Sequence, residues 1–122
     1  MAGTEPFVDS AASERPRIQI LSCSVVRAEL MFGARKSRQV DRNLEGFRRL
    51  LESCPCLPFD DEAADHYGEL RSILAKAGTV IGANDLMIAS IALAHRLVLV
   101  TRNIREFERV AGLPLDGWFE PI

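Results

Sequence analysis

The sequence predicts an α/β domain in which a parallel sheet is flanked by helices. Short β-prone runs alternate with helical patterns from residue 18 onward, which is typical of layered α/β folds. Residues 97–101 (LVLVT) are short, rich in β-branched side chains and apolar throughout, as expected for a parallel strand buried on both faces. With 122 residues, 48% of them hydrophobic, the chain fits one domain with a single core.

The first half of the chain predicts a loop, a strand and two helices. Residues 1–17 lack periodicity and contain Pro6 and Pro16, so we expect an irregular segment before a domain of residues 18–122. Residues 17–22 (RIQILS) predict a strand, and Ser22 or Ser24 is a suitable N-cap for a helix over 25–36. A second helix is predicted over 41–53, with the apolar stripe Leu44, Phe47, Leu50 and Leu51.

The second half continues the alternation. Residues 54–60 (CPCLPFD) interrupt the helix and predict a short extended piece. Asp60 or Asp61 is expected to cap a helix over 62–77 that Gly78 ends. The remaining predictions are a helix over 85–95, a strand over 97–101, a short helix ending at Gly112, and an edge strand anchored by Trp118.

Several classes of protein and site are excluded by composition. No apolar run reaches the roughly 18 residues of a membrane span, and the acidic N-terminus does not read as a signal peptide. The three cysteines have no zinc-site or redox-pair spacing, so we expect reduced thiols in a cytoplasmic protein. His66 and His95 lie on separate predicted helices without a nucleophile at a suitable spacing, which disfavours nucleophilic catalysis.

The net charge of −2 hides a strong asymmetry along the chain. Residues 27–49 hold seven Arg and Lys against three acids, whereas residues 52–69 hold six acids and no Arg or Lys. A basic segment of this kind can bind a phosphate backbone, and the alternative is a solvated helix face. The candidate residues for contacts with a nucleic-acid backbone are Arg27, Arg35, Lys36 and Arg38.

Two carboxylates occupy positions where apolar residues are expected. On a helical wheel Glu29 falls within the apolar arc of Val25, Val26 and Phe32, and a buried charge is costly unless it is paired or binds a metal ion. Asp85 opens an otherwise apolar helix. Alternative interpretations are an Arg salt bridge for Glu29 and a helix cap for Asp85 or Asn84.

A polar group also follows the buried strand over 97–101, because Asn103 stands two residues after it. A solvated turn with Asn103 as a cap is the ordinary explanation. Ligands of open α/β sheets bind beyond the carboxyl ends of the strands, so the two acids and this amide can meet at one edge. Oxygen ligands of this type suit Mg²⁺ or Mn²⁺, which can activate water against a phosphodiester.

From residue 21 to residue 118 the chain resembles the PIN-domain ribonucleases, in particular VapC-type toxins of bacterial toxin–antitoxin pairs. The resemblance rests on LSCSVVRAELMFGARKS, LPFDDEAADHYGELRSILAKAG and IGANDLMIASIALAHRLVLVTRNIREFERVAGLPLDGW, in that order. It implies a PIN-like parallel sheet flanked by helices and Mg²⁺-dependent cleavage of RNA, restrained by a cognate antitoxin. It implies catalytic roles for Glu29, Asp85 and Asn103, with Asp85 and Glu29 as metal ligands. A homodimer is also a family expectation.

The resemblance does not extend to the front of the domain. The family opens with a strand ending in an LDTN-like motif whose Asp binds metal, and only FVDS, with Asp9, is similar here. The ten residues after Asp9 are too few and too proline-interrupted for a parallel crossover. We therefore expect the first central strand to be missing or degraded and activity to be impaired by N-terminal truncation. The alternative function is an inactive PIN remnant that binds an antitoxin or a second copy.

Overall fold

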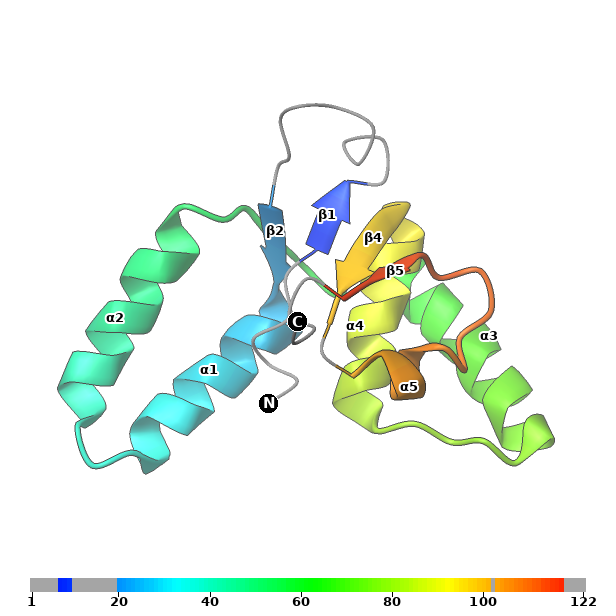
Figure 1. Ribbon diagram of the computed structural model, residues 1–122, viewed down its shortest axis with the longest axis horizontal. Coiled ribbons are helices and arrows are strands. Elements are labelled where there is room, and N and C mark those ends of the chain that lie inside the picture. Colours follow the sequence, from blue (N-terminus) through cyan, green and yellow to red (C-terminus); the bar gives the residue numbers. More distant parts are fainter. Residues whose placement is uncertain (1–6, 10–19, 102, 118–122) are drawn as a thin grey trace.

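A five-stranded sheet forms the middle of the computed structural model, which describes residues 7–9, 20–101 and 103–117 (Figure 1). The order of the strands in the sheet is β3-β2-β1-β4-β5. The strands are β1 (Phe7–Asp9), β2 (Ile20–Cys23), β3 (Cys56–Leu57), β4 (Leu97–Val100) and β5 (Leu115–Asp116). The helices are α1 (Ser24–Lys36), α2 (Val40–Glu52), α3 (Asp61–Ala77), α4 (Ala83–Ala94) and α5 (Ile104–Phe107).

The expected α/β fold with parallel strands and flanking helices is confirmed, but the sheet also contains one reversed strand. β2 pairs with β3, and β4 with β5, in parallel, whereas β1 is antiparallel to both of its neighbours. Four strands therefore point in one direction and only the central one is reversed. A reversed strand fits the short connection of residues 10–19, because antiparallel neighbours need no helical crossover.

The N-terminal segment takes part in the sheet where it is described. Of residues 1–17 the structure describes only 7–9, and these form β1 at the centre. The predicted boundary at residue 18 and the predicted loss of the family's first strand stay predictions, since most of this segment lies outside the described residues. Trp118, predicted as an anchor, also lies outside them.

Helix ends follow local chemistry at two positions and depart from it at one. The Asp60 side chain caps α3 by accepting a hydrogen bond from the Ala63 amide at 3.0 Å, and Gly78 ends α3 with a φ of 72°. Cys23 is the N-cap of α1 without a side-chain hydrogen bond, so the predicted Ser22 or Ser24 cap is wrong. Ser22 instead lies in β2, where its amide donates to the Pro55 carbonyl.

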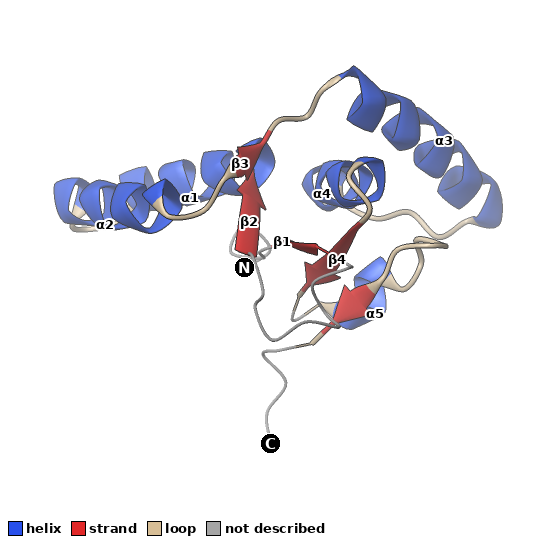
Figure 2. Ribbon diagram, turned by 90° about the horizontal axis from the view of Figure 1, so that it is seen from above, coloured by secondary structure: helices blue, strands red, loops and turns tan. Residues whose placement is uncertain are grey.

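Helix α4 lies in the interior of the domain, which explains why its sequence is apolar on every side. It contacts β4, α1 and α3, and α3 lies outside it, away from the sheet (Figure 2). Its fully buried residues include Ile88, Ala89, Ile91 and Ala92. No helix in the described ranges has the length and hydropathy needed to cross a membrane.

Helices α1 and α2 form a hairpin that extends away from the sheet on the side opposite α3 (Figures 1 and 2). Leu30 and Ala34 of α1 and Leu44 of α2 are buried. Two residues expected on the apolar stripes are exposed instead, because the hairpin has no further layer over it: Phe32 is 64% exposed and Leu50 is 58% exposed.

The turn between α4 and β4 contains a residue in an unfavourable backbone conformation. Arg96 has a φ of 56°, a region that glycine adopts without the Cβ clash of other residues. We expect Arg96→Gly to be about 1 kcal/mol more stable than Arg96→Ala in urea denaturation, since both variants remove the same side chain. Equal stabilities of the two variants would show that this turn relaxes without cost.

The thiol of Cys23 is expected to be inert in the folded protein. Burial raises its pKa to about 11 and outweighs the lowering effect of the backbone amides of Val26 and Val25, while Cys56 and Glu29 add smaller raising effects. At pH 8, iodoacetamide should therefore modify the exposed Cys56 much faster than Cys23, as measured by peptide mass spectrometry. Labelling of Cys23 should rise only in denaturant or above about pH 10. Comparable native rates at pH 8 would contradict this assignment.

Candidate metal and RNA site

The strand directions bring three chain segments to one edge of the sheet. β2 and β4 point the same way, because β1 is antiparallel to both. Helix α1 starts directly after β2, and α4 runs back along β4, so that its first turn lies near the end of β4. Glu29, Asp85 and Asn103 belong to these three segments, at the carboxyl ends of the strands where α/β sheets place their ligands.

Glu29 lies in the second turn of α1 and is partly buried, as its place on the wheel predicts. Its Oε1 atom is buried and accepts no hydrogen bond from any described residue. The alternative of a salt bridge to an Arg is not observed within the described ranges, where Arg49–Glu45 is the ion pair formed. A desolvated carboxylate oxygen is unfavourable unless a cation or donor reaches it, so this atom is a plausible metal ligand.

Asp85 is the third residue of α4 and not its cap. The N-cap is Gly82, so neither Asn84 nor Asp85 occupies the cap position of this helix. Asp85 is partly buried, and its Oδ1 atom is buried like Oε1 of Glu29. A carboxylate in the first turn interacts favourably with the helix dipole, which reduces the cost of holding a negative charge there.

The two acids come from helices that contact each other, α1 and α4. Within the described part of the chain, however, no group of three or more His, Cys, Asp or Glu side chains is close enough to hold a metal ion. A pair of carboxylates with few other protein ligands is compatible with Mg²⁺, which keeps several of its waters when bound.

Asn103 is paired with Glu106, an acid that is not among the predicted site residues. Its amide group donates to Oε2 of Glu106 at 3.0 Å, and its backbone amide donates to the buried Thr101 hydroxyl at 2.9 Å. Asn103 occupies the N-cap position of α5 but makes no side-chain cap bond. The spacing of three residues places Asn103 and Glu106 on one helical turn, and this spacing is the signal that identifies Glu106 in the sequence.

Asp9 does not join these residues. In the register of β1 it lies opposite Leu97, at the start of β4. The candidate site follows the other end of β4, about 13 Å away at roughly 3.3 Å per residue. The reversed direction of β1 thus leaves residue 9 at the opposite edge of the sheet from the candidate site.

The four candidate RNA-binding cations are all exposed and lie along α1 and its turn. Arg27 is on the first turns of α1, Arg35 and Lys36 are on its last turn, and Arg38 follows in the connection to α2. This turn is held by a hydrogen bond of 2.9 Å from the Asn43 amide to the Ser37 hydroxyl. The cations therefore extend from the sheet edge toward the tip of the α1–α2 hairpin (Figure 1).

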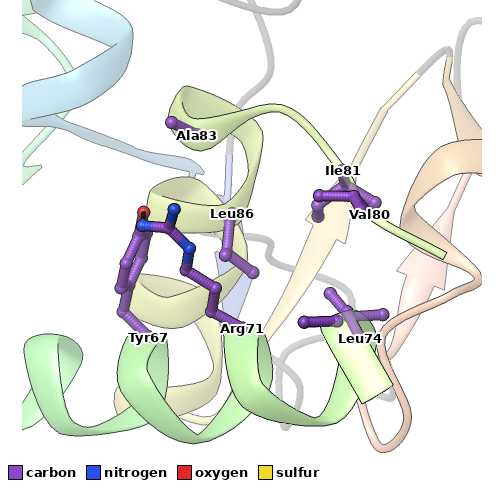
Figure 3. Close-up of a pocket in the computed structure, with 8 residues that line it drawn as sticks. Tyr67, Arg71, Leu74, Val80, Ile81, Ala83 and Leu86 are labelled. Carbon is purple, nitrogen blue, oxygen red and sulfur yellow. Dashed lines mark hydrogen bonds between the residues drawn. The ribbon is translucent and has the colours of Figure 1, made fainter. Parts of the chain in front are cut away.

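A separate pocket of about 270 Å³ lies between α3 and the start of α4 (Figure 3). Arg71 lies over the Tyr67 ring, 6.0 Å from its centroid, and donates to the Tyr67 hydroxyl at 3.3 Å. The lining residues are Tyr67, Arg71, Leu74, Ala75, Val80, Ile81, Ala83 and Leu86. Because this lining contains no carboxylate, the pocket is distinct from the candidate metal site.

The comparisons with known proteins agree on one family. The PIN-domain model matches residues 3–113. The chain is 45% identical over 98 residues to the tRNA(fMet)-specific endonuclease VapC of Salmonella typhimurium, covering 78% of this chain and 72% of the relative. It is 41% identical over 95 residues to Ribonuclease VapC2 of Rickettsia felis, covering 78% and 71% of the two chains.

A solved structure agrees with the sequence match. VapBC2 from Rickettsia felis, bound to a DNA fragment from its promoter, superposes with a TM-score of 0.79 at 40% identity, covering 82% of this chain and 75% of that chain. Both the order of the sequence blocks and the α/β architecture are therefore shared with VapC relatives. The chain belongs to the PIN-domain family, with VapC ribonucleases as its relatives.

Proposed function

We propose that this chain is a metal-dependent endoribonuclease of the VapC toxin type. The observation that carries the proposal is the buried Oε1 of Glu29 without a hydrogen-bond partner among the described residues, on a helix that contacts the helix of Asp85. A divalent cation, Mg²⁺ or Mn²⁺, is the partner whose binding would offset the cost of burying this oxygen.

Glu29 and Asp85 would hold the ion between α1 and α4. A bound ion of this kind supplies an activated water and stabilises charge on the phosphoryl group. Glu29 is in addition a candidate general base, since a carboxylate within reach of the attacking water can accept its proton. Asn103 uses its amide NH₂ on Glu106 and keeps Oδ1 as a neutral oxygen donor for the same site.

The proposed substrate is RNA, whose backbone would contact Arg27, Arg35, Lys36 and Arg38. These exposed cations follow one helix away from the candidate site, and phosphate contacts of this type supply affinity without reading sequence. The proposed protein partners are a cognate antitoxin, as in the VapBC toxin–antitoxin complexes of its relatives, and a second copy of the chain. The unpaired thiols of Cys23, Cys54 and Cys56 fit a cytoplasmic setting.

A second candidate function is a PIN module that binds an antitoxin or itself without cleaving RNA. The reversal of β1 favours it, because Asp9 lies at the opposite edge of the sheet from Glu29 and Asp85. Fewer carboxylates around a cation hold it less tightly. We therefore expect weak metal binding, with reduced cleavage if the chain is a nuclease and no cleavage if it is a binding module.

Cleavage of mixed single-stranded RNA in Mn²⁺ should depend on Asp85. We expect Asp85→Asn to lower the rate by about a hundredfold or more, since the neutral amide is a poorer ligand for the ion that activates water. The matched control is Asp65→Asn, which removes an exposed acid on α3 and should stay within about twofold of the unchanged protein. Cleavage is followed by gel electrophoresis of end-labelled RNA.

The result decides between the two candidate functions. If the unchanged protein and Asp85→Asn cleave at the same rate, or if neither cleaves above a protein-free blank, the enzyme proposal is rejected. The binding module then remains, and Asp85-dependent cleavage would reject that module in turn.

Glu29 should also reveal the metal through stability. In EDTA we expect Glu29→Gln to raise the free energy of unfolding by about 1 kcal/mol, because a neutral amide costs less to bury than a carboxylate without a partner. Mn²⁺ should raise the melting temperature of the unchanged protein and raise that of Glu29→Gln less. A destabilised Glu29→Gln with an undiminished Mn²⁺ shift would remove Glu29 from the metal site.

A further inference from the structure

Phe32 is a large apolar side chain that the core does not use. It is 64% exposed, although the helical wheel places it in the apolar arc of α1. Other exposed apolar residues are Leu50, Ile73 and Val80. Phe32 differs from these three by its position, because it follows Glu29 by one helical turn on the same helix.

A cation lies on the ring of Phe32. The ammonium group of Lys36 is 4.9 Å from the ring centroid, within the range of a cation–π contact. Glu29, Phe32 and Lys36 are spaced three and four residues apart, so they form one stripe along α1. Lys36 makes no ion pair with an acid among the described residues, and its charge remains available to a ligand.

The surroundings of Phe32 favour an anionic ligand. Arg35 and Arg38 are exposed beside Lys36, and neither forms an ion pair within the described ranges. Farther along the hairpin two cations are engaged, since Arg49 pairs with Glu45 at 3.1 Å and Arg42 donates to Gln39 at 2.9 Å. An exposed aromatic ring among unpaired cations is typical of surfaces that bind single-stranded nucleic acid, where bases stack and cations contact phosphates.

We propose that Phe32 stacks on an unpaired nucleobase of the RNA and that Lys36 contacts a neighbouring phosphate. This inference rests on the proposed function, which places the cleaved phosphate at Glu29. Three residues along a helix rise about 4.5 Å, and stacked nucleotides are about 3.4 Å apart. The stacked base is therefore about one or two nucleotides from the cleaved bond, and Phe32 selects for an unpaired nucleotide there.

Binding of a fluorescein-labelled single-stranded RNA oligonucleotide, measured by anisotropy in EDTA, tests this without cleavage. Phe32→Ala should weaken the Kd about fivefold to a hundredfold, the range found for loss of one base–aromatic stack. Phe32→Trp should retain or tighten binding. The matched control is Leu50→Ala, which removes an equally exposed apolar side chain from α2 of the same hairpin and should change the Kd less than twofold.

An oligonucleotide of the same length with abasic riboses separates stacking from charge. Phe32→Ala should bind it as tightly as the unchanged protein does, whereas Lys36→Met should weaken binding to both oligonucleotides and reduce the salt dependence. Thermal melting of each variant checks folding, which an exposed side chain should affect little.

Three results would overturn the stacking role. The first is an equal loss of RNA affinity in Phe32→Ala and Leu50→Ala. The second is a loss of affinity in Phe32→Ala that is as large on abasic RNA as on intact RNA. The third is unchanged RNA binding with weakened self-association in sedimentation, which would assign Phe32 to a protein interface. The proposed function fails separately. If RNA binding depends on Phe32 but cleavage does not depend on Asp85, the stacking role is retained and the nuclease proposal is rejected. If cleavage depends on Asp85 but Phe32→Ala binds RNA normally, the nuclease proposal is retained and the stacking role is rejected.

Discussion

The contact between α1 and α4 is the constraint on which the candidate site depends. Each helix carries an acid near its start, and one carboxylate oxygen of each acid is buried. Helix α4 is apolar on all sides because β4, α1 and α3 surround it, so an acid in its first turn lies where the interior meets solvent. Burial of the Glu29 oxygen without a hydrogen bond from a described residue opposes folding, and a cation bound there would offset that cost.

The direction of the strands determines which polar groups reach this place. Because β2 and β4 run the same way, the segments that follow them meet at one edge. β1 lies between them in the opposite direction, and its Asp9 is carried to the other edge. One reversed strand of three residues thus separates an acid from the candidate site without changing the order of strands in the sheet.

The α1–α2 hairpin joins this edge to the basic part of the chain. Its inner side is packed through residues such as Leu30, Ala34 and Leu44, while its outer side has no further layer over it. The same geometry leaves Phe32 and the cations beside it facing solvent. A hairpin that projects from the edge with Glu29 and Asp85 in this way offers an extended surface to a long anionic ligand, and the charge of residues 27–49 suits that ligand.

Local sequence was sufficient for the helices and for the burial of Glu29. Periodicity predicted the bounds of α1 to within one residue, and Asp60 and Gly78 predicted the ends of α3. The helical wheel placed Glu29 among apolar neighbours. All three features depend on residues within a few turns of the same helix. Pairing between distant segments required the tertiary structure. The reversal of β1, the exposure of Phe32 and Leu50, and the Asn103–Glu106 contact depend on what packs beside each segment, which local periodicity does not encode.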